Sequence, residues 1–462
     1  MRYNWFRLFW TICLLLPLTT VNAQEEQPTG AVYIVQAGDT LSGIANQFGV
    51  SITDLINANQ LTDPNSIKAG DQLLIPGLEG ISGVLNTQTV PFGENVRSLS
   101  LRYRLPEALL ARLNHLTSPA EIYAGAGLII PEADTPPAVN DRTALWETGS
   151  LLELAILNDV NPWEILSANN ITSSHSLIPG AVFWLPGESE DGPGALPSGI
   201  NALELPDFIQ GKTGLIRLSG EFDLSPAGSF MDHPLNFYPQ GTGEYTALQG
   251  VHAMAQPGIY PLSIQGNLPN GAHFAFSQMV PVFAGDFLYD APLIVDPATI
   301  DPEVTRPEDA QWTALALPVS AEKLWDGVFL APVDAVFAEC WPSRYGSRRA
   351  YNNSDYIYFH TGLDFCGGVG DNVYAPAPGS VVFAGPLSVR GNAIMIDHGH
   401  GIYTGYMHLS EILVEVGESV GTGQLIGKVG GTGRVTGPHL HWEVWVGGVQ
   451  VDPLDWLQQA YP

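Results

Sequence analysis

Hydrophobic and polar positions follow different periods in different parts of this chain. Between about residues 200 and 290 apolar and polar residues alternate, as in residues 260–264 (YPLSI) and 274–276 (FAF), with glycine at the turns. Such alternation is typical of β-strands that have one buried face. Short apolar runs bounded by glycine or proline, at residues 379–385 and 392–397, predict further strands. The pattern therefore favours a mainly β, multidomain protein.

A repeat with a period of 55 residues precedes the alternating region. The positions that recur are Asn59, Asn114 and Asn169; Gly70, Gly125 and Gly180; and Pro76, Pro131 and Pro186. A repeat of this length is one supersecondary unit. We predict strand, helix, helix and strand in each of three small α+β modules, at residues 31–77, 86–132 and 141–187.

Composition changes mark the other boundaries. Linkers rich in proline, glycine and acid are expected at residues 24–30, 132–141 and 187–199. The length of the alternating region, residues 200–290, suits an immunoglobulin-like β-sandwich. Pro307-Glu308-Asp309 and Ser320-Ala321-Glu322 resemble helix starts, because acids are favoured in a first turn. Residues 291–330 are therefore predicted to be a helical connector to a C-terminal domain at residues 331–462.

The N-terminus predicts export. Arg2 and Arg7 precede an apolar run and the small residues Val21-Asn22-Ala23, as in a secretory signal peptide spanning residues 1–23. No later stretch offers about 20 consecutive apolar residues for a membrane span. We expect a secreted monomer, extracellular or associated with the cell wall; retention of the segment as a signal anchor is the alternative. Cys13 lies inside the apolar run, so a lipoprotein is not expected.

Charge and cysteine content narrow the picture further. The chain has 18 basic and 47 acidic residues and a formal net charge of -29, which excludes a nucleic-acid binder with a basic footprint. Removal of the predicted signal peptide, which contains Cys13, leaves two cysteines, Cys340 and Cys366. An even number of cysteines in an oxidising compartment predicts a disulfide. A thiolate ligand at Cys366, two residues after Asp364, is the alternative.

Candidate chemistry gathers in the last hundred residues, where six of the eleven histidines lie between positions 360 and 441. The groups singled out are His360, Asp364, His408, His439 and His441. Neutral imidazoles and one carboxylate are preferred ligands of zinc. Three protein ligands leave a position for water, whose pKa a metal lowers towards about 7. The two groups left over are suited to proton transfer, so the pattern predicts a hydrolytic zinc site.

Side-chain direction supports convergence of these groups. Residues two apart in a strand share a face, so His439 and His441 are expected to project into one cleft. His360 and Asp364 are four apart, with Gly362 between them to let the backbone bend. His398 and His400, by contrast, are interpreted as turn residues or as hydrogen-bond partners of a ligand.

A series of short motifs follows in order along the last part of the chain, including residues 360–364 (HTGLD), 373–376 (VYAP), 406–410 (YMHLS), 430–433 (GGTG) and 437–441 (GPHLH). Through these motifs about residues 341–457 resemble the lysostaphin-type, LytM-like zinc endopeptidases that cut peptide stems and bridges of bacterial peptidoglycan. The resemblance implies a compact antiparallel β-sheet with a long cleft. It also implies that His360, Asp364 and His441 bind one Zn²⁺, and that His408 and His439 are catalytic, orienting water and stabilising the oxyanion. No ligand is missing, so we expect an active enzyme.

The first repeat unit begins with residues 33–41 (YIVQAGDTL) and ends at Pro76. In this it resembles LysM modules, which bind glycans containing N-acetylglucosamine. The resemblance implies a glycan-binding role for Gly38, Asp39, Thr40 and Leu41. The second unit has residues 93–96 (GENV) and the third has residues 148–151 (TGSL) in place of this motif. For these two units a packing role and glycan binding remain equally open.

Both resemblances point to peptidoglycan as the partner. The main hypothesis is a LysM-targeted zinc endopeptidase that hydrolyses amide bonds of peptidoglycan during wall remodelling or lysis. A wall-binding scaffold or activator with a silent or occluded peptidase domain is the competing hypothesis. A secreted peptidase for glycine-rich proteins is the third.

Overall fold

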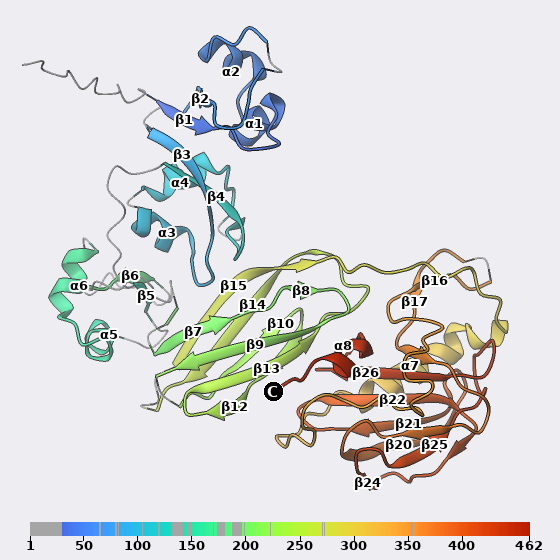
Figure 1. Ribbon diagram of the computed structural model, residues 1–462. Coiled ribbons are helices and arrows are strands. Elements are labelled where there is room, and N and C mark those ends of the chain that lie inside the picture. Colours follow the sequence, from blue (N-terminus) through green and yellow to red (C-terminus); the bar gives the residue numbers. More distant parts are fainter. Residues whose placement is uncertain are drawn as a thin grey trace, which may run out of the picture. The chain divides into compact units, whose positions relative to one another are not determined.

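The computed structural model describes residues 30–462 apart from residues 64–65, 79–80, 82, 104, 119–120, 132–141, 146–149, 170, 173–180, 187–195, 198, 222, 270, 272 and 353. The predicted signal peptide therefore lies outside the described residues. Of the described residues, those up to Asn86 together with Pro131 belong to one compact unit, and Thr87–Ile130 together with those after residue 141 belong to the other. None of the described helices is both long enough and apolar enough to cross a membrane. The fold is mainly β, as predicted (Figure 1).

Each repeat unit has the predicted order of strand, helix, helix and strand. The first contains β1 (Ala31–Ile34), α1 (Leu41–Phe48), α2 (Ile52–Ala58) and β2 (Gln72–Leu74). The second contains β3 (Gly83–Thr89), α3 (Val96–Tyr103), α4 (Glu107–Leu113) and β4 (Gly127–Pro131). The third contains β5 (Arg142–Ala144), α5 (Leu151–Leu157), α6 (Pro162–Ala168) and β6 (Val182–Trp184).

The recurring asparagine explains the period of the repeat. Asn59 follows α2, and its Nδ2 donates to Leu55 O at 2.9 Å and to Leu74 O at 2.8 Å, while its Oδ1 accepts from Leu74 N at 2.6 Å. Asn114 and Asn169 make the same three bonds in their own units. The side chain thus joins the end of the second helix to the strand 15 residues later.

Two packed sheets follow the repeats, in the region predicted to be a β-sandwich. One has the order β11-β10-β14-β15-β8 and the other the order β12-β13-β9-β7. Their strands are β7 (Ile200–Glu204), β8 (Phe208–Ile209), β9 (Thr213–Gly220), β10 (Ala227–Phe230), β11 (His233–Asn236), β12 (Tyr238–Gly241), β13 (Glu244–Gly250), β14 (Gly258–Asn267) and β15 (His273–Phe283). Phe208, Phe230 and Phe274 are buried between the sheets. The immunoglobulin-like assignment stays a prediction.

The connector is less helical than predicted. After the 3-10 turn η3 (Pro297–Thr299), helix α7 (Pro302–Leu315) begins five residues before Pro307, because the Asp301 side chain caps Glu303 N at 3.0 Å. The second predicted helix start was wrong. Ser320 donates to Glu322 O instead of capping a helix, and Lys323 forms a β-bridge with Gly399.

The C-terminal domain is built on a sheet of the order β18-β26-β22-β21-β20-β24, with β27 paired to β26, and on the sheet β19-β25-β23. The bounds are β16 (Arg348–Arg349), β17 (Tyr358–Phe359), β18 (Leu363–Phe365), β19 (Asn372–Tyr374), β20 (Gly379–Leu387), β21 (Gly391–Asp397), β22 (Ile402–Leu409), β23 (Glu411–Ile412), β24 (Ser419–Val420), β25 (Leu425–Lys428), β26 (Leu440–Val446), β27 (Val449–Val451) and α8 (Pro453–Gln458). All pairs in the larger sheet are antiparallel.

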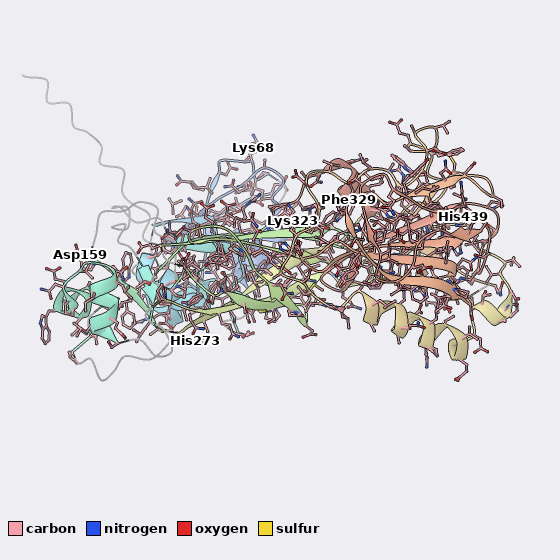
Figure 2. The ribbon with its side chains drawn as sticks, turned by 90° about the horizontal axis from the view of Figure 1, so that it is seen from below. Lys68, Asp159, His273, Lys323, Phe329 and His439 are labelled. Carbon is pink, nitrogen blue, oxygen red and sulfur yellow. A yellow bond between two sulfur atoms is a disulfide. The ribbon has the colours of Figure 1, made fainter. Side chains whose placement is uncertain are left out.

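Alternation along β26 separates a core face from a site face. Trp442 and Val444 enter the main core of the domain. Trp445 packs on the other face, together with Trp312 of α7. Since alternate residues of a strand share a face, His441 lies on the same side as Trp445. Helix α7 runs along this side of the sheet (Figure 2).

Candidate metal centre and active site

Three donor atoms converge at the edge of the C-terminal sheet. His360 Nε2 lies 2.9 Å from both Asp364 Oδ1 and His441 Nδ1, and His441 Nδ1 lies 2.8 Å from Asp364 Oδ1. The three residues are 1%, 7% and 6% exposed, respectively. These are the residues that the sequence resemblance implies as metal ligands, and the structure brings them together.

Strand register positions two of these side chains. Asp364 on β18 and His441 on β26 are directly opposed. His360 follows β17, and the turn from His360 to β18 presses Gly362 against β26. A Cβ at Gly362 would lie 2.3 Å from Trp442 O and 2.8 Å from His441 Nε2. The close approach of β26 therefore requires glycine between His360 and Asp364.

Hydrogen bonds fix which nitrogens carry protons. His360 Nδ1 lies 2.9 Å from Arg344 O, which can only accept, so Nδ1 carries the proton and Nε2 has a lone pair. The Glu443 carboxylate, 3.4 Å from His441 Nε2, likewise leaves a lone pair on His441 Nδ1. Two lone pairs and the Asp364 carboxylate thus face one another. Such a cluster is repulsive without a cation, and its donor set fits zinc.

The pKa shifts agree with a cation site. Burial lowers the pKa of His360 to about 4 and keeps it neutral. Burial opposes the charge of Asp364, yet His360 and His441 hold its pKa well below its usual range. Burial also opposes protonation of His441, but hydrogen bonds to Asp364 and Glu443 outweigh it and raise the pKa of His441. A proton on His441 therefore competes with a metal for the same position.

The two remaining histidines, His408 and His439, each have an unprotonated Nε2 beside this centre. His408 Nδ1 donates to Thr432 O and His439 Nδ1 donates to Gly437 O, both at 2.9 Å, so each Nε2 has a lone pair. The two rings lie 5.1 Å apart, and His439 Nε2 is 3.6 Å from Asp364 Oδ1. Burial and the imidazoles of His441 and His439 lower the pKa of His408 well below its usual value. The His439 side chain is 18% exposed.

A β-bulge in β22 sets the direction of the His408 side chain. Between Tyr406 and Leu409, β22 has two residues opposite the single Ala393 of β21. His408 takes up the extra length with a φ of 62°, in the left-handed region that non-glycine residues rarely adopt. Backbone strain of this kind concentrates at functional sites.

The cleft beside the centre has a volume of about 540 Å³ and is lined by more than the C-terminal domain. Asp364, His408, His439 and His441 lie in its wall. The sandwich adds His252 and Met254, and the connector adds Leu293, Val295, Asp309 and Thr313. No pattern in the sequence indicates that these segments line the cleft, because the contacts join residues far apart in the chain.

Two arginines beside the cleft are held by carboxylates that precede the C-terminal domain, and neither arginine was predicted from the sequence as a site residue. Arg349 Nε donates to Asp290 Oδ2 at 3.0 Å, and its Nη2 lies 3.6 Å from Asp364 Oδ2. Arg390 pairs with Glu308 at 3.0 Å and with Asp309 at 2.9 Å. The connector is therefore part of the construction of the site.

His398 and His400 lie away from the candidate ligands. His398 Nδ1 donates to Pro378 O at 2.7 Å, and its Nε2 lies 2.8 Å from Thr404 Oγ1. His400 has a φ of 51° in a turn, and its ring stacks on Tyr238 of the sandwich at 3.4 Å. Within the described residues neither is hydrogen-bonded to a candidate ligand, so the turn interpretation fits better than a supporting role at the metal.

The Gly-Asp-Thr-Leu motif of the first repeat unit has structural partners within its own module. Gly38 has a φ of 96°, and Asp39 Oδ2 accepts from Tyr33 OH at 2.9 Å and from Gln36 N at 2.7 Å. Thr40 caps α1, and Leu41 is buried. The glycan-binding role of these four residues stays a prediction.

The corresponding loop of the second unit packs on the sandwich. Gly93 N donates to Gln278 Oε1 at 2.6 Å, and Gln278 Nε2 donates to Glu94 O at 3.2 Å. Phe92 also contacts Phe276, with ring centroids 6.0 Å apart. These contacts favour the packing alternative for this unit.

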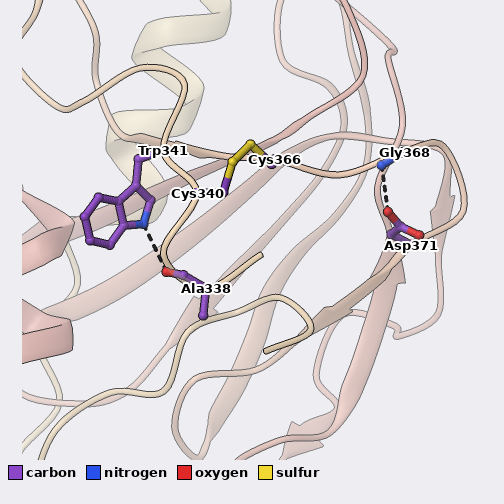
Figure 3. Close-up of a disulfide and its surroundings, with 6 residues drawn as sticks. All are labelled: Ala338, Cys340, Trp341, Cys366, Gly368 and Asp371. Carbon is purple, nitrogen blue, oxygen red and sulfur yellow. Dashed lines mark hydrogen bonds between the residues drawn. A yellow bond between two sulfur atoms is a disulfide. The ribbon is translucent and has the colours of Figure 1, made fainter. Parts of the chain in front are cut away.

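A disulfide joins Cys340 to Cys366, with the Cα atoms 5.5 Å apart (Figure 3). Cys366 N also donates to Cys340 O, and Asp364 N donates to Ser343 O, both at 3.0 Å. The segment from Cys340 to Ser343 thus lies along β18 beside Asp364. The bonded sulfur leaves no thiolate to serve as a metal ligand.

A buried His/Asp/His centre with two further histidines at a cleft is the arrangement of a metal-dependent hydrolase. Residues 358–453 match the model of Peptidase family M23. Residues 33–76, 89–131 and 150–186 match the LysM domain model. The chain therefore contains a family M23 peptidase domain and three LysM domains, and both resemblances seen in the sequence are confirmed.

Individual relatives match the C-terminal part of the chain. The chain is 42% identical over 112 residues to the peptidoglycan DD-endopeptidase ShyA of Vibrio cholerae, covering 24% of this chain and 26% of that protein. It is 45% identical over 95 residues to the DD-carboxypeptidase/endopeptidase Mpg of Neisseria meningitidis, covering 21% and 22%. The solved structure of lysostaphin from Staphylococcus simulans is 38% identical, with a TM-score of 0.21, and covers 21% of this chain and 44% of that one. The chain thus matches about a quarter of the length of these curated relatives.

Proposed function

We propose that the protein is an exported zinc metalloendopeptidase that hydrolyses peptide bonds in the stems or cross-bridges of peptidoglycan and is directed to the glycan by LysM. The observation that carries the proposal is the convergence of two imidazole lone pairs and one carboxylate oxygen within 2.9 Å of one another. The peptidase family match and the names of the relatives, which describe peptidoglycan endopeptidases, support the substrate.

The proposed ligands are His360 through Nε2, Asp364 through Oδ1 and His441 through Nδ1. A zinc ion bound there supplies Lewis acidity, which polarises the scissile carbonyl and makes water a nucleophile at neutral pH. Asp364 stays ionised, because its pKa is held well below its usual range, and so balances part of the metal charge.

Proton transfer is assigned to His408 and His439, whose Nε2 atoms are unprotonated. The lowered pKa of His408 keeps it neutral, so it can accept the proton of the attacking water. His439 is more exposed and faces the same space. Once protonated it can hydrogen-bond the developing oxyanion or return a proton to the leaving amine.

Zinc stoichiometry combined with amine release from purified peptidoglycan tests the proposal. We expect one zinc per chain and chelator-sensitive amine release from the wild type. Asp364→Ala is expected to lose the metal, and His408→Ala to keep it without hydrolysis. His400→Ala, on the turn against the sandwich, is the matched control and should keep both. A zinc-loaded protein that binds wall and releases no amine would favour the scaffold or activator instead.

A further inference from the structure

Three arginines line the cleft, and each is held by a different kind of partner. Arg349 is paired with Asp290, at the end of the sandwich region, and Arg390 is paired with Glu308 and Asp309 of the connector. Arg434 is held instead by a backbone oxygen, since its Nη1 donates to Thr299 O at 2.9 Å. Among the residues that the structure describes, no carboxylate forms an ion pair with Arg434.

Arg434 is nevertheless fixed in place. Its guanidinium lies 4.9 Å from the centroid of the Tyr351 ring, and its backbone N donates to Val389 O at 2.8 Å. The neighbouring Gly433 has a φ of 77° and fits against the backbone of Val389 and Gly391 so closely that a Cβ would lie 2.4 Å from Val389 O. The loop therefore presents a half-buried, preorganised cation to the cleft, on the wall that also carries His439.

We propose that Arg434 binds a free carboxylate of the peptide substrate and so sets specificity for acidic stem peptides over amidated ones. The inference rests on the proposed function, because it names a feature of the substrate at the same site. A guanidinium has five donors in a planar fork that matches a carboxylate. Only one of these donors is used by Thr299 O, and stacking on Tyr351 limits rotation of the fork.

Charge on the rest of the chain strengthens the argument. The protein carries a formal net charge of -29, so an anionic peptide is repelled at long range. A local cation without its own counterion compensates this repulsion at the cleft. Arg349 and Arg390 are less suited to this, because an incoming carboxylate would compete with carboxylates already bound to them.

The test uses the full mature chain and a fluorescent cross-linked stem-peptide dimer, prepared as the free acid and with its carboxyl groups amidated. Cleavage is followed by chromatography, and binding by anisotropy with a chelator present so that turnover does not consume the probe. For the wild type we expect kcat/KM and affinity to favour the acid by about ten- to a hundredfold, the range of a hydrogen bond to a charged group. Arg434→Gln should abolish this preference, mainly through KM, and Arg434→Lys should keep part of it.

Arg217→Gln is the matched control, because Arg217 is an exposed arginine of the sandwich, paired with Glu204 at 3.6 Å. It should leave the preference for the acid unchanged. Equal cleavage of acid and amide by the wild type overturns the inference and leaves the proposed function standing. Acid-selective binding that depends on Arg434 but occurs without cleavage supports the inference and overturns the endopeptidase. Absence of both binding and cleavage overturns both.

Discussion

Glu443 Oε1 lies 3.4 Å from His441 Nε2, and both side chains project from the same face of β26. Glu443 is fully buried and accepts from Trp312 Nε1 at 2.9 Å, Trp445 Nε1 at 2.8 Å and Gln450 Nε2 at 2.9 Å. Burial alone would favour its neutral acid, but the hydrogen bond from His441 and nearby positive charge lower its pKa to about 2. The carboxylate therefore orients the ring of His441, a proposed metal ligand, through the nitrogen that does not face the metal position.

Replacing Glu443 by Gln is expected to weaken zinc binding about ten- to a hundredfold, the usual effect of removing such a partner. The physical reason is that both oxygens of the carboxylate accept hydrogen bonds, so an amide, which keeps only one oxygen, has one acceptor fewer for the same neighbours. Competition with a chromophoric chelator measures the affinity. The control Glu411→Gln, at an exposed position of β23, should leave the zinc affinity unchanged. An unaltered zinc affinity in Glu443→Gln would show that Glu443 does not support the metal site.

Adjacent acids on α7 should differ sharply in their contribution to stability. Glu308 is buried and accepts from Val389 N at 2.8 Å and from Arg390 N and Nη1 at 3.0 Å, whereas the Asp309 side chain is 60% exposed. Glu308→Ala leaves buried donors and a cation without their partner and should reduce the free energy of unfolding by about 3 kcal/mol. Asp309→Ala should cost less than about 1 kcal/mol.

Urea unfolding followed by tryptophan fluorescence measures both variants, since Trp312 lies on the same helix. Equal effects of the two substitutions would contradict the view that the buried acid anchors the connector to the cleft.

The repeated asparagine should hold each LysM module closed. Asn59→Ala removes three hydrogen bonds between α2 and β2, so the Leu74 amide loses its acceptor. We expect local opening to become easier by about 2 kcal/mol, which is a roughly thirtyfold faster amide exchange at β2. Hydrogen–deuterium exchange read by mass spectrometry measures this. Asn57→Ala, at an exposed position on the same helix, should leave exchange at β2 as in the wild type.

Acid should destabilise the peptidase domain through His398. Burial lowers its pKa to about 4, against about 6.5 in the unfolded chain. Between these values the unfolded state binds a proton that the folded state does not, so stability falls as pH drops from about 6.5 to about 4. The loss through this one residue amounts to at most about 3 kcal/mol.

Thermal unfolding as a function of pH, compared between the wild type and His398→Asn, isolates this contribution. The variant is expected to be less stable at pH 7 but to have a shallower decline on acidification. The control His115→Gln replaces an exposed histidine and should retain the wild-type decline. A variant curve parallel to the wild type would assign the acid sensitivity to other groups.

Local patterns were sufficient for much of the fold. The strand, helix, helix and strand order of each repeat and the strands near Gly379 and Asn392 follow from short-range periodicity. The connector helix was only partly predicted, because the cap at Asp301 was overlooked and Ser320 bonds to a nearby carbonyl instead of starting a helix.

The residues of the candidate site likewise divide into those that local sequence patterns identify and those that only the tertiary structure reveals. His360, Asp364, His408, His439 and His441 were found because they lie in short motifs within one domain. Glu443 could also have been found, since it lies two residues after His441 and shares its face of the strand. His252, Asp290 and Thr299 could not, because only tertiary contacts between distant segments bring them to the cleft or to its arginines.

Mass spectrometry of fragments released from purified peptidoglycan by the mature protein, with and without a zinc chelator, tests the central claim most directly. The account predicts fragments with a new amine and a new carboxyl terminus, abolished by the chelator and restored by zinc. Wall that stays intact in the presence of zinc-loaded protein bound to it would contradict the account.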